Sequence, residues 1–162
     1  MLHLLHPALV HFSVAFLIAG GACEAWGVFR RNAALERFGA TLLVAGTASL
    51  LPTIVAGLLA KNSIVVPPDA IDDLELHERL GFALAAVLLL SQFWKAWRGG
   101  RLGGSERTGY VALVLLGLAL VVAVAFVGAE MVYEHGVGTD AAHDSAAEEG
   151  LEDVAGDPGI LP

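Results

Sequence analysis

The hydrophobic residues of this chain are concentrated in four long blocks, which are separated by short charged stretches. The blocks cover about residues 7–29, 38–60, 76–97 and 108–133, and the second contains no charged residue. About 20 consecutive apolar residues are enough for a helix to cross a bilayer. The pattern therefore predicts an all-α polytopic membrane protein whose four transmembrane helices form a bundle.

The composition excludes an ordinary soluble domain. Hydrophobic residues make up 56% of the 162 residues and charged residues 16%, whereas soluble domains have about 45–50% apolar and about 25% charged residues. A single core of this size cannot bury so much apolar surface. The lipid bilayer is the expected environment.

The positions of lysine and arginine predict how the helices are oriented. Seven of the nine basic residues fall in or beside the connections after the first and third blocks: Arg30, Arg31, Arg37, Lys95, Arg98, Arg101 and Arg107. The positive-inside rule places these connections in the cytoplasm. We therefore expect an N-out/C-out protein of the bacterial inner (cytoplasmic) membrane, with both termini on the periplasmic side.

An acidic tail follows the four-helix membrane domain, which we assign to residues 1–138. Residues 139–162 hold seven acidic residues and no lysine or arginine, and so they carry most of the net charge of -8. This composition predicts a tail that is disordered or ordered only against a partner. A strongly acidic chain also argues against nucleic-acid binding.

Four histidines are predicted to meet in one layer at the outer face. His6 and His11 open the first block, His77 opens the third, and His135 follows the fourth. Because consecutive helices alternate in direction, these positions share one end of the bundle. Ionisable residues at membrane depth are functional candidates, and His11 is the strongest, because it lies about one turn inside its helix.

One interpretation of this layer is a b-type haem site. Two imidazoles on different helices can bind haem iron from both faces, and we expect His11 and His77 to be the axial ligands. His6 and His135 are the alternates, or a second pair, and Arg79 is a candidate partner for a propionate. The only cysteine is Cys23, so the covalent C-x-x-C-H motif is absent.

Two other interpretations stay open. The layer could bind a copper, zinc or iron ion through His11, His77, His135 and Glu130, since imidazole and carboxylate suit such ions. Alternatively the bundle is a cofactor-free structural subunit, whose histidines line a partner or quinone surface. Glu24, deep in the first block, is a separate candidate for an ion pair with Arg30 or Arg31 or for a proton relay.

Three motifs together resemble a known family. They are His6-Pro7-x-x-Val10-His11-Phe12, His77-Glu78-x-x-Gly81 and Tyr133-Glu134-His135-Gly136-Val137-Gly138. Over residues 3–138 the chain is similar to the bacterial DUF2231 membrane proteins, with one departure at Ser13, where the family often has proline. The resemblance implies a four-helix membrane domain without an established function. Similar members are joined to Rieske-type or cytochrome domains, which favours electron transfer.

These observations favour a non-enzymatic function. The leading hypothesis is a membrane b-type cytochrome, or the haem-carrying anchor subunit of a redox complex. Electrons would pass between a quinone pool or membrane partner and an external redox protein. The chain would supply ligands, orientation and a low dielectric rather than bond chemistry.

Overall fold

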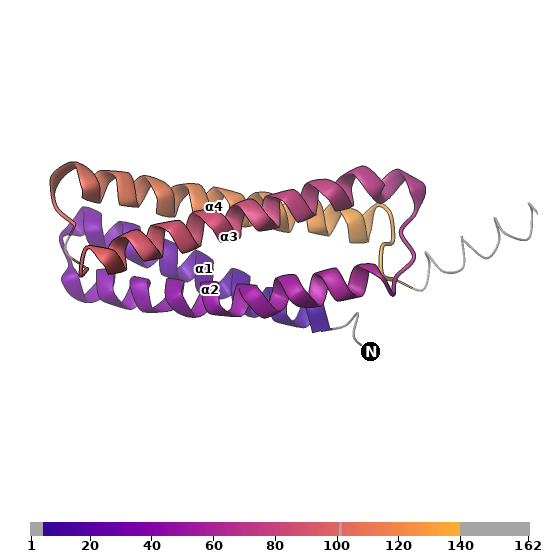
Figure 1. The fold of residues 1–162 in the computed structure, drawn as a ribbon, viewed down its shortest axis with the longest axis horizontal. Helices are drawn as coiled ribbons and strands as arrows, with labels where there is room; N and C mark the ends of the chain where they lie inside the picture. The colour runs from indigo at the N-terminus through magenta and orange to yellow at the C-terminus, as the bar shows by residue number, and fades with distance from the viewer. Residues whose placement is uncertain (1–4, 101, 140–162) are drawn as a thin grey trace, which may run out of the picture.

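Four long helices make up the computed structural model, which describes residues 5–100 and 102–139. They are α1 (Leu5–Arg30), α2 (Ala33–Lys61), α3 (Ile71–Trp97) and α4 (Gly104–Tyr133), and a short 3-10 helix, η2 (Pro68–Ala70), precedes α3 (Figure 1). Each long helix is long and apolar enough to cross a membrane. The prediction of an all-α, multi-pass membrane protein with four helices is confirmed. Most of the predicted acidic tail lies outside the described residues.

The helices run alternately up and down, so the bundle has two distinct ends (Figure 1). We call one the histidine end, where α1 and α3 begin and α2 and α4 finish. The other is the basic end, where α1 and α3 finish and α2 and α4 begin, with residues 31–32, 98–100 and 102–103 between the helices. Which end faces the cytoplasm stays a prediction from the positions of lysine and arginine.

A tight turn joins α1 to α2 at the basic end. Arg31 adopts a left-handed backbone conformation with φ 53°. Asn32 then caps α2, because its side-chain oxygen accepts from the main-chain N–H groups of Ala34 and Leu35 at 3.1 Å each. Capping of this kind satisfies donors that have no partner within the helix. The two helices are thereby held side by side.

Glycines bring the backbones of α1 and α2 into close contact. A Cβ atom added to Gly39 would lie 2.3 Å from the main-chain nitrogen of Glu24, and one added to Gly20 would lie 2.7 Å from that of Leu43. Small residues allow such approach between membrane helices, where packing rather than the hydrophobic effect drives association. We therefore describe α1 and α2 as one closely packed hairpin.

The buried core is divided into two parts. The central cluster draws on all four helices and includes Leu17, Leu43, Leu50, Leu84, Leu88, Tyr110, Val114 and Val121. The cluster nearer the histidine end contains Ala70, Val127, Met131 and Val137, with Ile64, Val66, Leu74 and Leu80 packed against it. It joins α3 and α4 to the preceding loop and does not reach α1. At that level, polar residues connect the hairpin of α1 and α2 to the hairpin of α3 and α4 instead.

Candidate cofactor-binding site at the histidine end

Two imidazole rings meet between the hairpins at the histidine end. The ring centroids of His6, on α1, and His77, on α3, are 6.4 Å apart and the ring planes are at 77°. Both side chains are half-buried. The fold thus brings together two potential metal ligands from helices that are not adjacent in the sequence.

The ring of His6 is oriented by the backbone of α2. Its Nδ1 lies 2.8 Å from the carbonyl oxygen of Thr53. Because a carbonyl oxygen can only accept, Nδ1 carries the hydrogen and donates it. The unprotonated nitrogen of the neutral ring is then Nε2, and histidine metal ligands are commonly held in this way.

Hydroxyl groups support this part of α2. The hydroxyl of Ser13, on α1, lies 3.0 Å from those of Ser49 and Thr53. Ser13 and Thr53 are 2% and 4% exposed, so the network is shielded from solvent and lipid. It holds α1 against α2 two turns below His6, and so it fixes the segment that carries the ring.

Each of the two rings lies against a glycine of a neighbouring helix. A Cβ atom on Gly57 would be 2.9 Å from Nδ1 of His6, and one on Gly128 would be 2.9 Å from Cε1 of His77. The backbone of Val124 is also close to the His77 ring. Nδ1 of His77 is buried and has no hydrogen-bond partner within the described part of the chain.

His11 occupies a different place from the one predicted. It is exposed on the outer surface of α1, and its Nδ1 donates to the carbonyl oxygen of Pro7 at 2.6 Å. A step of five residues rotates a side chain by about 140° around a helix, so His6 and His11 cannot face the same neighbour. The predicted juxtaposition of His11 with His77 is corrected, since His6 takes that position.

His135 is held by two carboxylates. Its Nδ1 lies 3.2 Å from Asp69, on η2, and its Nε2 lies 3.2 Å from Asp73, on α3. Only the doubly protonated ring can donate to both partners. This histidine fastens the segment after α4 to the start of α3, and it leaves no free nitrogen for the predicted role as alternate ligand.

The sequence was compared with known proteins. The family model described as "Predicted membrane protein (DUF2231)" matches residues 2–141. The chain belongs to the DUF2231 family. No curated protein and no solved structure matches the chain. The resemblance to DUF2231 predicted from the three motifs is confirmed for this protein.

Other candidate residues of this DUF2231 protein lie apart from the histidine pair. Arg79 is exposed and donates to Glu75 at 2.8 Å, while Lys61 pairs with Glu78 at 2.8 Å and joins α2 to α3. Glu130 is half-buried on α4. In residues 5–100 and 102–139, no three His, Cys, Asp or Glu side chains converge as metal ligands. The predicted ion site of His11, His77, His135 and Glu130 is therefore not assembled.

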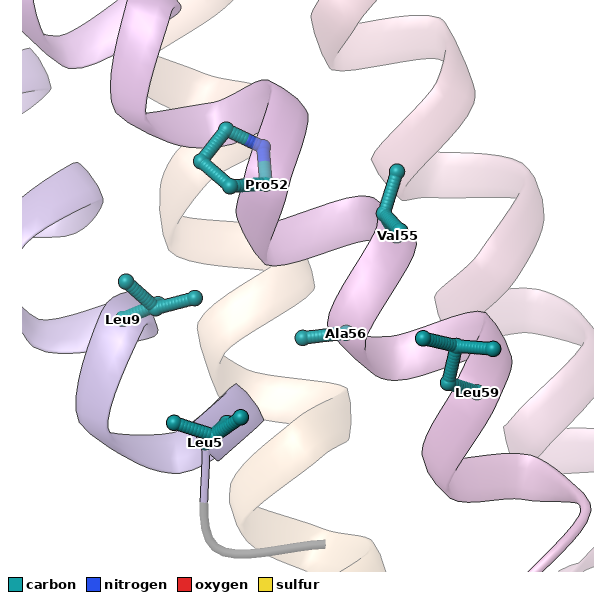
Figure 2. A pocket seen from close by; sticks show the side chains of 6 residues that line it. All are labelled: Leu5, Leu9, Pro52, Val55, Ala56 and Leu59. Atoms are coloured by element: carbon teal, nitrogen blue, oxygen red, sulfur yellow. The ribbon is translucent and has the colours of Figure 1, made fainter. Parts of the chain in front are cut away.

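An apolar hollow of about 400 Å³ lies between α1 and α2 at the histidine end, and neither histidine of the pair lines it. Figure 2 shows its side chains, which come from the start of α1 and the second half of α2: Leu5, Leu9, Pro52, Val55, Ala56 and Leu59. These residues offer no side-chain donor or acceptor. In a membrane, hydrocarbon chains can fill such a surface, so we do not assign it as the functional site.

The sequence contains a pattern that could have predicted the inward position of His6 but that our prediction did not use. Buried or half-buried small and polar residues recur every seven residues along the seam between α1 and α2. On α1 they are His6, Ser13, Gly20 and Gly27, and on α2 they are Gly39, Gly46, Thr53 and Ala60. A heptad repeat keeps residues on one helix face, and His11 is outside it.

Proposed function

We propose that this DUF2231 protein binds one b-type haem between His6 and His77 and serves as a membrane cytochrome or a haem-carrying subunit of a redox complex. The observation that carries the proposal is the pair of imidazoles, 6.4 Å apart on helices of different hairpins. Four-helix bundles hold cofactors through side chains on facing helices in this manner.

The number of ligands favours haem over a bare ion. Structural zinc sites take four protein ligands and catalytic sites three, whereas the described chain brings only two histidines together here. A haem supplies the other ligands itself and needs only axial ligands from the protein. A site with two imidazoles is therefore sufficient for haem.

The spacing of the rings also suits a shared iron. Imidazole nitrogens bind first-row metals at about 2.0–2.1 Å, so two rings on one ion have centroids roughly 6 Å apart. The observed separation is 6.4 Å. His6 has its Nδ1 committed to Thr53, which leaves Nε2 as the nitrogen of this ring that would bind the iron.

The surroundings are compatible with a planar cofactor. The apolar cluster nearest the pair does not extend to α1 within the described residues, and the absence of a side chain at Gly57 and Gly128 lets the two rings lie against α2 and α4. Lys61 and Arg79 are cations of the same end, paired with Glu78 and Glu75, and Arg79 would exchange its partner for a propionate. The protein would not catalyse a reaction itself but would pass electrons between a membrane or quinone partner and a redox protein outside the inner membrane.

The test is the cofactor content of protein purified from cells that make haem. We expect a Soret band and about one haem per chain by pyridine haemochrome, in keeping with a single pair of ligands. Stoichiometric copper or zinc without haem would replace this proposal with an ion site. Absence of both haem and metal would favour a structural subunit and overturn the proposal.

A further inference from the structure

A second polar group lies at the basic end and includes the most deeply buried acid of the described chain. Glu24, on α1, is 0% exposed. Its Oε1 accepts hydrogen bonds from the ammonium of Lys95, on α3, and, at 2.8 Å, from the hydroxyl of Tyr110, on α4. We propose that Glu24 is a proton-binding site that exchanges with the aqueous phase at the basic end. The proposal does not depend on haem binding.

The two oxygens of the Glu24 carboxylate have different surroundings. Both partners approach Oε1, whereas Oε2 is buried and has no hydrogen-bond partner within the part of the chain that the structure describes. A buried polar atom without a partner is costly. In a purely structural ion pair we would expect both oxygens to be satisfied, so the charge of Glu24 is only partly compensated by its two donors.

Charged groups connect Glu24 to the surface. Lys95 lies 3.7 Å from Glu36, on α2, and Glu36 accepts from Arg107, on α4, at 2.8 Å. The side chains of Glu24, Lys95, Glu36 and Arg107 are 0%, 18%, 25% and 38% exposed, respectively. Acidic and basic groups thus alternate along a path of increasing exposure, which leads from the buried Glu24 to the surface.

A hollow gives water access to the same group. About 180 Å³ of space lies at the basic end beside Gln92, Lys95, Tyr110 and Gly100, with Ala40, Val44 and Ala96 completing its wall. A water molecule occupies about 30 Å³, so the space is large enough for several. Gly100 belongs to the connection at the basic end, and the hollow therefore leads from the aqueous side to the Lys95 ammonium.

The proton transfer can be written with all charges balanced. Lys95 gives one of its three protons to Glu24, and the neutral amine is protonated again by water in the hollow or through Glu36. The net result is one proton taken from the aqueous phase and held by Glu24. The charges facing this carboxylate are Lys95 from α3, Glu36 from α2 and Arg107 from α4, and the Tyr110 hydroxyl is the neighbouring uncharged donor.

Infrared difference spectroscopy of the full chain in lipid nanodiscs, recorded between neutral and acidic pH, tests the proposal. We expect a protonated-carboxyl band that shifts in D2O, is lost in Glu24→Gln and is retained in Glu130→Gln, the control at the opposite end. Persistence of the whole band in Glu24→Gln would overturn the proposal. So would the absence of any such band from the wild-type protein.

The access route is tested separately with variants that keep Glu24. Val44→Trp should fill the hollow and slow the appearance of the D2O shift at least tenfold, whereas Val122→Trp, on the lipid-facing side of α4, should leave its rate unchanged. If Glu24→Gln does not fold, Lys95→Met provides the second measurement. It leaves a buried carboxylate without its cation, which favours the protonated form, so the band should appear at a less acidic pH than in the wild-type protein. An unchanged rate in Val44→Trp or an unchanged band in Lys95→Met would contradict the proposal.

Discussion

His6 of α1 and His77 of α3 face one another at the histidine end, with ring centroids 6.4 Å apart. The backbone of α2 orients the first ring through Thr53, and Gly128 of α4 makes space for the second. All four helices therefore contribute to the placement of one pair of imidazoles.

The glycine beneath His77 should be needed for cofactor binding. A Cβ at Gly128 would be 2.9 Å from the ring, so Gly128→Leu must displace it. We expect haem affinity to fall by about 10–100-fold, as when supporting contacts are lost at metal sites. Gly81→Leu is the matched control, because no atom lies within 4 Å of a Cβ there. Haem titration measures the haem affinity of both variants. Equal affinities of Gly128→Leu and Gly81→Leu would contradict the proposed site.

The close contact of α1 with α2 should not tolerate a methyl group at Gly39. Its Cβ would meet the backbone of Glu24 at 2.3 Å, and the backbone cannot move aside as a side chain can. Gly39→Ala should lower the free energy of unfolding by about 3 kcal/mol, the upper part of the range for overpacked cores. Gly21→Ala meets only the side chain of Leu118 and should cost less than about 1 kcal/mol. Unfolding in mixed detergent micelles measures the free energy of unfolding of both variants. Similar losses in Gly39→Ala and Gly21→Ala would contradict the backbone contact.

The ion pair between Glu24 and Lys95 should show strong energetic coupling. Lys95→Met leaves a fully buried carboxylate without its cation, and we expect a loss of about 3–5 kcal/mol in unfolding free energy. Glu24→Gln in the Lys95→Met background should restore much of that loss, because it removes the uncompensated charge. A double-mutant cycle measures the coupling, and additive losses would show that the two residues do not interact.

The contacts of His135 should hold the segment that follows α4. Asp73→Asn removes one carboxylate partner of the ring, and ion pairs near the protein surface contribute up to about 1 kcal/mol. Hydrogen exchange in residues 134–139 should accelerate by up to roughly fivefold. Asp72→Asn, an exposed neighbour on α3, should leave the exchange unchanged. The same acceleration in both variants would show that the effect is not specific to His135.

Much of this fold could be predicted from hydrophobicity alone, whereas the identity of the histidine pair could not. The number of spans follows from the length of the apolar blocks. The side of α1 that faces α2 cannot be predicted from these lengths. A membrane helix is apolar both toward lipid and toward its neighbours, and α1 has no single apolar face. The depth of His11 in the helix therefore led us to predict it as the partner of His77, whereas the rotational position of His6 around the helix makes His6 the partner. The seven-residue repeat that includes Ser13 and Gly20 indicates which side of α1 faces α2.

The pairings of polar residues seen in the structure could not be predicted from the sequence for a related reason. Glu24 pairs with Lys95 of α3 rather than with Arg30 or Arg31, which are closer in the sequence. Asp69 and Asp73 meet His135 only because η2 and α3 fold back against the end of α4. Such contacts depend on the relative rotation of packed helices, which no local pattern specifies. The sequence could place these residues at one end of the bundle but could not pair them.

The most direct test of the proposed site is the visible spectrum of three histidine variants, purified from the same haem-replete cells. His6→Ala and His77→Ala should each lose the low-spin bis-imidazole spectrum, and most of the bound haem, because each removes one axial ligand. His11→Ala should retain both, since that ring lies on the outer surface of α1. A wild-type spectrum in His6→Ala together with haem loss in His11→Ala would contradict the assignment of His6 and His77.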